Sequence, residues 1–308
     1  MLKVFGHSTP DTDSTCSAIA YAWLLSECLG RPATAYVQGP INKESAYVLE
    51  HFSVPIPPLL GSLQLGDKVV IVDTNNPEEL PRDFDLAELV EVVDHHKLSG
   101  LTTVHPVTMT LRPVACTATI IWQIAQESHS TKLPTEIAGM LLAALLSDTL
   151  KFTSPTTTDA DKLAGAELAT MAGVDNEVLA QGMFEAKSDL TGMDAEALLL
   201  SDSKVFSLGE RKLRISSLET TKPQYALAMK DELITAMQNL KISQGLDGIF
   251  LFIVNILSSE ATLLVPSDFE KHIAEKGFAQ NFDAAGIMPL PGIVSRKKQM
   301  LPGIEKGL

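Results

Sequence analysis

The sequence predicts an α/β protein with an N-terminal doubly wound, mostly parallel sheet and a smaller C-terminal α/β domain with a mixed sheet. Three observations support this fold class. The length of 308 residues favours two domains or one large α/β unit, because a domain usually has about 100–200 residues. Short apolar runs alternate with helical patterns in the first half, as in parallel sheets that are covered on both faces. A second series of strand-like runs lies near the end of the chain.

The predicted elements of the first half follow from hydrophobic periodicity. Strands are expected at 2–5, 34–37, 68–72 and 88–93, the second being weak. Helices are expected at 14–29, 116–128 and 135–147, with Thr117 as a cap of the second and Pro134 and Thr135 opening the third. A helical pattern continues over 155–182.

The domain boundary is predicted near 187–194, where Ser, Asp and Gly interrupt the helical pattern. We therefore expect a first domain over 1–188, a linker over 189–195 and a second domain over 196–308. In the second domain the apolar runs predict strands at 203–207, 212–217, 248–257 and 261–265, with a helix over 223–241.

Charge and cysteine content exclude several classes of protein. Lys and Arg number 24 against 38 Asp and Glu, for a net charge of −14, which argues against a protein that coats nucleic acid. A small anionic substrate is still possible, since a few local cations or metal ions reverse the sign inside a cleft. The three cysteines, Cys16, Cys28 and Cys116, form no CxxC pair, so neither a disulfide framework nor a structural zinc site is indicated.

A soluble, cytoplasmic location is expected. The first residues turn polar by position seven, so no signal peptide is visible, and the longest apolar runs, at 139–146 and 248–257, are too short to span a bilayer. We expect no membrane partner.

Four short segments place Asp or His directly after an apolar strand or helix: GHSTPDTD at 6–13, VDTNN at 72–76, VVDHH at 92–96 and LLSDT at 145–149. In an open parallel sheet, residues that follow the carboxyl ends of the strands face one common crevice. Segments spread over 140 residues of sequence can therefore converge on one site.

A cluster of carboxylates requires a counter-charge, because the carboxylates repel one another and are poorly solvated when buried. Divalent metal ions supply it. Four Asp with two or three His is a mixed oxygen and nitrogen set that suits Mn, Co, Fe or Mg, and it is too large for one ion. The sequence therefore predicts two metal ions, an arrangement used for the hydrolysis of phosphoryl compounds.

Cations near the C-terminus form a second candidate site. Arg296, Lys297 and Lys298 are consecutive in SRKKQ, and Lys204 lies in the same predicted domain. Such a run is often only a solvated patch, but beside a two-metal site it suits phosphate binding, because Arg forks to phosphate oxygens and Lys adds a point charge.

The segments HSTPDTD, VDTNN, VVDHH, LLSDTLKFTSPTTTD and SRKKQ, in this order and spacing, resemble those of the family II (DHH-superfamily), manganese-dependent inorganic pyrophosphatases. The similarity spans nearly the whole chain, including ACTATII at 115–121 and KSDLTGM at 187–193. The DHH segment marks only the wider phosphoesterase superfamily, whereas SRKKQ and the short second domain narrow it to pyrophosphatase.

The resemblance implies a catalytic first domain that holds two Mn²⁺ ions per subunit, with Co²⁺ as a substitute. One ion would be held by His7, Asp11 and Asp73, and the other by Asp13, Asp73, His95 and Asp148. Asp73 would bridge the two, and a metal-bridging hydroxide would be the nucleophile.

The resemblance also implies how pyrophosphate is bound and cleaved. His96 would donate a hydrogen bond and a proton to the leaving phosphate, and Asp94 would orient its neighbours. Lys204, Arg296 and Lys297 of the second domain would clamp the phosphoryl group, with Mg²⁺ entering alongside the substrate. A homodimer through the N-terminal domains is a further expectation.

Two positions depart from the family pattern. Thr74 stands where the family often has His, and Ala115 stands where it often has Gly. Neither change removes a predicted ligand. A methyl group at position 115 matters only if the backbone there needs a positive φ.

The alternative prediction is another DHH phosphoesterase: an exopolyphosphatase, or a cyclic-dinucleotide or oligonucleotide phosphodiesterase. These relatives often carry a Gly-Gly-x-His type motif, whereas the one His after Asp148 in this sequence is His272, with no glycine pair before it. Aromatic residues make up 6% of the chain, fewer than a single-strand nuclease needs for base stacking. A binding protein without catalytic activity is disfavoured, since every expected ligand and cation is present.

Overall fold

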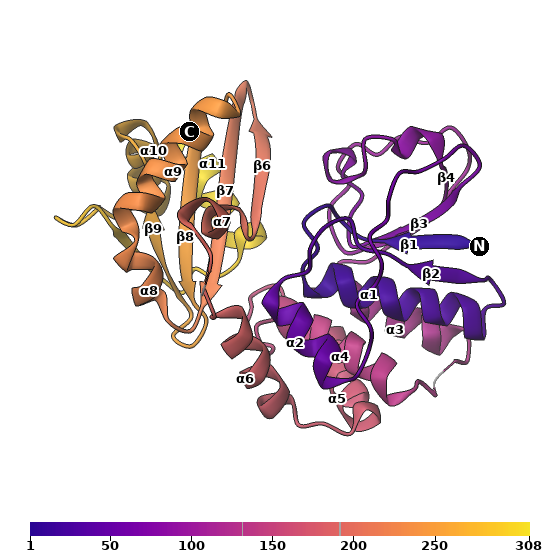
Figure 1. Cartoon of the computed structure of the whole chain (residues 1–308). Helices are drawn as coiled ribbons and strands as arrows, with labels where there is room; N and C mark the ends of the chain where they lie inside the picture. Colours follow the sequence, from indigo (N-terminus) through magenta and orange to yellow (C-terminus); the bar gives the residue numbers. More distant parts are fainter. Residues whose placement is uncertain (131, 191) are drawn as a thin grey trace. The chain divides into compact units, whose positions relative to one another are not determined.

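The computed structural model describes residues 1–130, 132–190 and 192–308. The chain divides into two compact units, Met1–Met183 and Phe184–Leu308 (Figure 1). The predicted linker 189–195 includes Thr191, which lies outside the described residues. Within the described part of the chain, no helix is both long and apolar enough to cross a membrane.

A five-stranded parallel sheet forms the frame of the first unit. Its strands follow the order β2-β1-β3-β4-β5, and every neighbouring pair is parallel. The strands are β1 (Leu2–Phe5), β2 (Ala33–Ala35), β3 (Lys68–Val72), β4 (Glu88–Asp94) and β5 (Thr108–Leu111). The predicted parallel sheet is confirmed, and β5 is a strand that the prediction missed, since TMTL carries no long apolar run.

Several helices belong to the first unit, and the last of them extends past its boundary. They are α1 (Thr12–Trp23), which continues as a π-helical turn over Leu24–Cys28, α2 (Lys43–His51), α3 (Thr117–Glu127), α4 (Thr135–Asp148), α5 (Asp159–Ala172) and α6 (Asn176–Lys187). Helix α4 is apolar on all sides and contacts α1, α3 and α5 (Figure 1). A helix of that composition is stable only when buried, so α4 forms the core of this unit.

Local signals explain where these helices begin and end. Helix α1 begins two residues before the predicted start, because the side chain of Asp11 caps it by accepting from the Ser14 amide. The helical pattern predicted over 155–182 is two helices. Gly173, with φ of 65°, ends α5 in the left-handed conformation that glycine adopts readily.

The two faces of the first sheet are covered differently. Helices α1 and α3 pack on one face. On the other face Phe5, Val69 and Ile71 pack with Leu60, Leu63 and Phe84, which come from irregular segments and a 3₁₀ turn at Phe84–Leu86. A further 3₁₀ turn lies at Pro77–Glu79. Long helices are not needed there, because the apolar side chains of these segments bury the strands.

The second unit has a mixed five-stranded sheet of order β10-β9-β8-β7-β6, in which β7 and β8 are parallel and the other pairs antiparallel. The strands are β6 (Ser203–Leu208), β7 (Arg211–Thr220), β8 (Gly248–Asn255), β9 (Glu260–Leu264) and β10 (Met288–Pro291). The mixed sheet is as predicted. Its helices are α7 (Ala195–Leu200), α8 (Pro223–Ala228), α9 (Lys230–Ser243), α10 (Asp268–Phe278) and α11 (Leu301–Gly307).

The C-terminal segment is fixed by close backbone packing. Ser295 caps a π-helical turn over Arg296–Met300, which leads into α11. Helices α10 and α11 approach so closely that a Cβ atom on Gly277 would lie 2.1 Å from the carbonyl oxygen of Gly303. The glycine of α10 therefore sets the position of the segment that bears SRKKQ.

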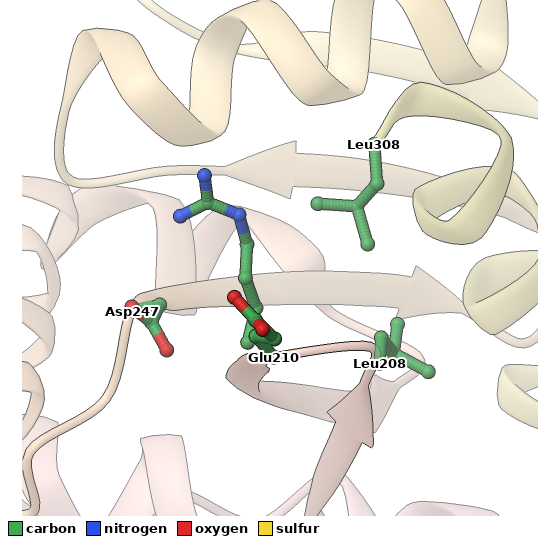
Figure 2. Close-up of a pocket in the computed structure, with 5 residues that line it drawn as sticks. Leu208, Glu210, Asp247 and Leu308 are labelled. Atoms are coloured by element: carbon green, nitrogen blue, oxygen red, sulfur yellow. The ribbon is translucent and has the colours of Figure 1, made fainter.

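A pocket lies within this unit (Figure 2). It has a volume of about 400 Å³ and is lined by Leu208, Glu210, Arg211, Asp247 and Leu308. None of the predicted site residues lines it, so it is separate from the proposed chemistry.

The Gly277→Ala variant is expected to destabilise the protein by about 1–3 kcal/mol, because the backbone of Gly303 cannot yield to the new methyl group. Helix propensity alone predicts the opposite sign, since Ala is a better helix former than Gly. The measurement is the free energy of unfolding in urea. The control is Lys271→Ala on the exposed side of α10, expected to change stability by less than about 0.5 kcal/mol. A Gly277→Ala protein as stable as the wild type would contradict the close packing.

Candidate metal centre

The carboxyl ends of strands β1, β3 and β4 bring the predicted ligands together. Strands β1, β3 and β4 are mutually parallel neighbours, so the residues after them meet at one edge of the sheet. The N-terminus of α1 and the C-terminus of α4 supply the rest. Three groups have ligand atoms within 4.8 Å of one another: His7, Asp11 and Asp73; Asp13, His95 and Asp148; and Asp73, Asp94, His95 and His96.

Asp73 lies between the histidines of the two predicted metal sites. Its Oδ2 atom is 3.3 Å from His7 Nε2, and its Oδ1 atom is 3.3 Å from His95 Nε2. His7 Nε2 is also 3.4 Å from Asp11 Oδ2, and His95 Nε2 is 3.8 Å from Asp148 Oδ2. One carboxylate thus presents an oxygen to each site, as a bridging ligand must.

The backbone of Asp73 is strained in a way that serves this position. Its φ is 58°, in the left-handed region that costs a non-glycine residue about 1–2 kcal/mol. The amide of Asp73 donates to the Val93 carbonyl at 2.9 Å, which holds the turn against β4. Because the chain turns sharply here, the carboxylate points along the sheet edge toward both histidines.

A backbone carbonyl group sets the ring orientation of His95. Its Nδ1 atom lies 3.2 Å from the Val114 carbonyl oxygen. A carbonyl only accepts, so Nδ1 carries the proton and Nε2 keeps a lone pair for a metal ion.

His96 is held by Asp94 in the same way. Its Nδ1 atom is 2.8 Å from Asp94 Oδ1, and its backbone amide donates to the same oxygen at 3.0 Å. Asp94 is fully buried, and its Oδ2 accepts from Asn75 Nδ2 at 2.5 Å. Both oxygens of Asp94 therefore have protein donors, and one of those donors is the His96 ring whose orientation Asp94 sets.

The carboxylates of the cluster have divergent pKa values. Burial, reinforced by the negative charge of Asp73, raises the pKa of Asp13 to about 7. Burial also acts to raise the pKa of Asp73, but hydrogen bonds from His7 and His95 outweigh it and hold that pKa well below the ordinary value. The pKa of Asp94 is lowered as well, because the hydrogen bond and charge of His96 outweigh burial. Below about pH 7 the metal-free cluster thus keeps a proton on Asp13.

The donor set fits the predicted metal ions. Carboxylate oxygens and imidazole nitrogens suit Mn²⁺ and similar divalent ions, and a bound cation offsets both the burial and the repulsion from Asp73 that raise the pKa of Asp13. His7, Asp13 and Asp73 are each at most 5% exposed, so water alone compensates these charges poorly.

Sequence reasoning missed the residues that orient the ligands. Thr117 donates its amide to Asp13 Oδ2 at 2.7 Å and its hydroxyl to Asp73 Oδ1 at 3.2 Å. Ser17 donates to Asp13 Oδ1 at 2.6 Å. For Ser17 a signal existed, because it lies one helical turn after Asp13 on the same helix face. For Thr117 the sequence indicated only a helix cap.

The structure accommodates both departures from the family pattern. The Thr74 hydroxyl donates to Glu79 Oε2 at 2.6 Å and accepts from the Asn76 amide at 3.1 Å, so it ties together the loop after β3. Ala115 is not among the residues with positive φ, so a methyl group there causes no backbone strain.

The predicted phosphate-binding cations lie in the second unit. Lys204 is on β6, and Arg296 and Lys297 begin the turn that leads into α11. Arg296 Nη1 lies 2.6 Å from Asp202 Oδ1, and its side chain is 18% exposed. Asp202 therefore fixes the guanidinium while leaving part of it open to solvent.

Matches to known protein families and to individual relatives cover nearly the whole chain. Residues 2–145 match the model of the DHH family, N-terminal domain, and residues 181–306 match the DHHA2 domain. A Deinococcus radiodurans protein named "probable manganese-dependent inorganic pyrophosphatase" is 42% identical over 99% of this chain and 98% of its own length. A Bacillus licheniformis protein of the same name is 36% identical over 99% of this chain and 98% of its own length.

Solved structures agree with the sequence relatives. The crystal structure of a Methanococcus jannaschii protein assigned to the family II inorganic pyrophosphatases has a TM-score of 0.87 and 31% identity, covering 100% of this chain and 99% of that one. A Bacteroides fragilis exopolyphosphatase-related protein has a TM-score of 0.52 at 14% identity, covering 99% of this chain and 92% of that one, and it shares the fold alone.

Asp13→Asn is expected to stabilise the metal-free protein at pH 8 by about 1 kcal/mol or more, or about 2–4 °C in Tm. The raised pKa of Asp13 stabilises the folded state fully below about pH 4, and this contribution is lost as the pH rises through about 7. At pH 8 the wild type therefore carries the full repulsion, whereas near pH 4 the two proteins should have similar Tm. Calorimetry of chelator-treated protein with and without Mn²⁺ is the measurement.

Asp11→Asn is the matched control for this prediction. Burial acts to raise the pKa of Asp11, but the charge of His7 outweighs it, so that the pKa is lowered and neutralisation should not raise the Tm. Added Mn²⁺ should raise the Tm of Asp13→Asn less than that of the wild type. A metal-free Asp13→Asn protein less stable than the wild type at pH 8 would show that repulsion does not dominate this cluster.

Proposed function

Because the chain belongs to the family II (DHH-superfamily), manganese-dependent inorganic pyrophosphatases, we propose that it hydrolyses inorganic pyrophosphate to two orthophosphate ions by a two-metal mechanism. The observation that carries the proposal is the position of Asp73, with one oxygen 3.3 Å from His7 and the other 3.3 Å from His95. Two ligand groups that share one carboxylate are what a binuclear centre requires.

In this proposal one Mn²⁺ ion is held by His7, Asp11 and Asp73. The other is held by Asp13, Asp73, His95 and Asp148. Co²⁺ would substitute in the same ligand set, and Mg²⁺ would enter with the substrate. The bound ions would supply the Lewis acidity that activates the attacking water between them and offsets the charge of the substrate.

We assign proton donation to His96. Asp94 holds its Nδ1 atom at 2.8 Å, so Nε2 is the ring atom that would donate to the leaving phosphate. His96 is more exposed than His7 or His95, as expected of a side chain that meets substrate rather than a metal ion.

We assign the grip on the phosphoryl group to Lys204, Arg296 and Lys297. A planar guanidinium donates two parallel hydrogen bonds to phosphate oxygens, and the ammonium groups add charge. Asp202 supports this assignment, since a side chain already held by one carboxylate loses less freedom when it binds. The catalytic domain of the proposal is 1–188, the clamping domain 196–308 and the linker 189–195.

We further propose a cytoplasmic homodimer that pairs through the N-terminal domains. Strand β5 is an edge strand of the first sheet, and Met109 on it is 38% exposed. An unpaired edge with an exposed apolar residue is a surface that proteins usually cover.

The proposal is tested by phosphate release from pyrophosphate after incubation with Mn²⁺ and with Mg²⁺ in the assay. Tripolyphosphate, cyclic di-AMP and a short oligonucleotide are run in parallel. Asp73→Asn should reduce turnover far more than Asp94→Asn, because Asp73 is the shared ligand. Asp94 only orients other residues, and the loss of such a residue typically lowers activity about 10–100-fold. Cleavage of a longer substrate with pyrophosphate left intact would favour another DHH phosphoesterase. Equal losses in the two variants would refute the bridging role.

Arg296→Ala is expected to lower kcat/KM for pyrophosphate by about 10–100-fold, the value of a charged hydrogen bond, with a higher KM and a lower kcat. Steady-state kinetics over a range of pyrophosphate concentrations measures both constants. Lys306→Ala, which removes an exposed charge from α11 of the same unit, is the control and should behave as the wild type. Unchanged kinetics in Arg296→Ala would mean that SRKKQ is only a solvated patch.

A further inference from the structure

Thr117, the first residue of α3, joins two carboxylates that are far apart in the sequence. Its backbone amide donates to Asp13 Oδ2 at 2.7 Å across 104 positions of sequence, and its hydroxyl donates to Asp73 Oδ1 at 3.2 Å across 44 positions. The residue is fully buried. Thr117 is not a ligand itself, since both of its polar groups near the cluster act as donors.

In the proposed centre Asp13 belongs to one metal site, whereas Asp73 belongs to both. Asp13 groups with His95 and Asp148, and Asp73 is the carboxylate shared with His7 and Asp11. A donor to one oxygen of a carboxylate fixes its rotation and leaves defined lone pairs for a metal ion. One threonine therefore controls the orientation of a ligand in each site.

We propose that Thr117 is a positioning residue of the metal centre, whose hydroxyl holds Asp73 in its bridging orientation and raises the affinity for both metal ions. This inference rests on the proposed two-metal centre and adds a residue to it. Hydrogen bonds to ligands from surrounding residues are typically worth 10–100-fold in metal affinity.

Asp161 holds the loop that carries Thr117. This fully buried carboxylate accepts from the Ala115 amide at 3.2 and 3.1 Å and from the Thr119 hydroxyl at 2.7 Å. It also accepts from the amide and the hydroxyl of Thr158, at 2.7 and 2.6 Å. Asp161 thus fixes the chain at Ala115 and at Thr119, on both sides of Thr117, and so holds Thr117 in place beside the cluster.

The position of Thr117 in α3 adds an electrostatic contribution. The first amides of a helix carry partial positive charge and favour anions. In the metal-free protein this end of α3 partly offsets the negative charge of Asp13, whose amide donor it supplies. The side-chain bond to Asp73 is separate from this effect, so a substitution that removes only the hydroxyl isolates it.

The test compares Thr117→Val, which replaces the hydroxyl by a methyl group of similar size, with Thr117→Ser, which keeps the hydroxyl. Chelator-treated full-length protein is titrated with Mn²⁺ by calorimetry and by electron paramagnetic resonance. The expected result is about a tenfold or greater loss of affinity in both binding steps for Thr117→Val. Thr117→Ser should retain the wild-type affinity within about twofold, which a packing role of the methyl group does not predict.

The matched control is Thr15→Val in α1. Thr15 is fully buried, and within the described structure its hydroxyl has no hydrogen-bond partner, so the same change there removes no contact with the cluster. Its manganese affinity should equal that of the wild type. Circular dichroism establishes that each variant is folded. If Thr117→Val does not fold, Thr117→Ala removes the same hydroxyl without placing a methyl group against Asp73.

The outcomes separate this inference from the proposed function. Wild-type affinity in a folded Thr117→Val or Thr117→Ala protein would overturn the inference, as would an equal loss in Thr117→Ser. A wild type that binds two Mn²⁺ ions but leaves pyrophosphate intact would overturn the substrate alone. A wild type that binds no Mn²⁺ would overturn both proposals.

Discussion

The mutual repulsion of buried carboxylates is the constraint on which the rest of the first unit depends. Asp13, Asp73 and Asp94 are each at most 2% exposed and lie at one edge of the sheet. Water does not compensate such charges, so the fold must supply donors and counter-charges. The cost of ionising a buried carboxyl group here is evident in the pKa of Asp13, which burial and the charge of Asp73 raise to about 7. A divalent cation is one form of the counter-charge that such a cluster needs.

The surrounding strands and helices position the carboxylates and supply hydrogen-bond donors to them. Parallel strands deliver their following residues to one edge, and the N-termini of α1 and α3 direct amides at Asp11 and Asp13. The apolar helix α4 ends at Asp148 and carries that carboxylate to the cluster. Stability and site geometry are therefore coupled: the burial of the leucines in α4, about 1.5–3 kcal/mol each, holds a ligand in place.

The sequence predicted the fold class and the meeting of the site residues because both depend on short-range patterns. An apolar strand followed by Asp or His is readable from adjacent letters, as in VVDHH. Elements such as β5, α2 and α10 were missed, since their apolar residues are few and their stability comes from tertiary packing. Thr117 could not be assigned from the sequence for the same reason. Its partner Asp13 lies 104 positions away, and no local pattern encodes that contact.

The carboxylates of the first unit and the cation Arg296 of the second are held in different ways. Asp13, Asp73 and Asp94 are buried and accept hydrogen bonds from protein donors, so the fold itself sets their orientation. Arg296 is instead held by Asp202, which is itself 47% exposed and so easily hydrated. An ion pair of this kind contributes about 0–1 kcal/mol, so Asp202 orients the guanidinium without holding it strongly. For the proposed reaction, the buried carboxylates would suit ions that stay bound, whereas Arg296 would suit a phosphate group that binds and leaves in each turnover.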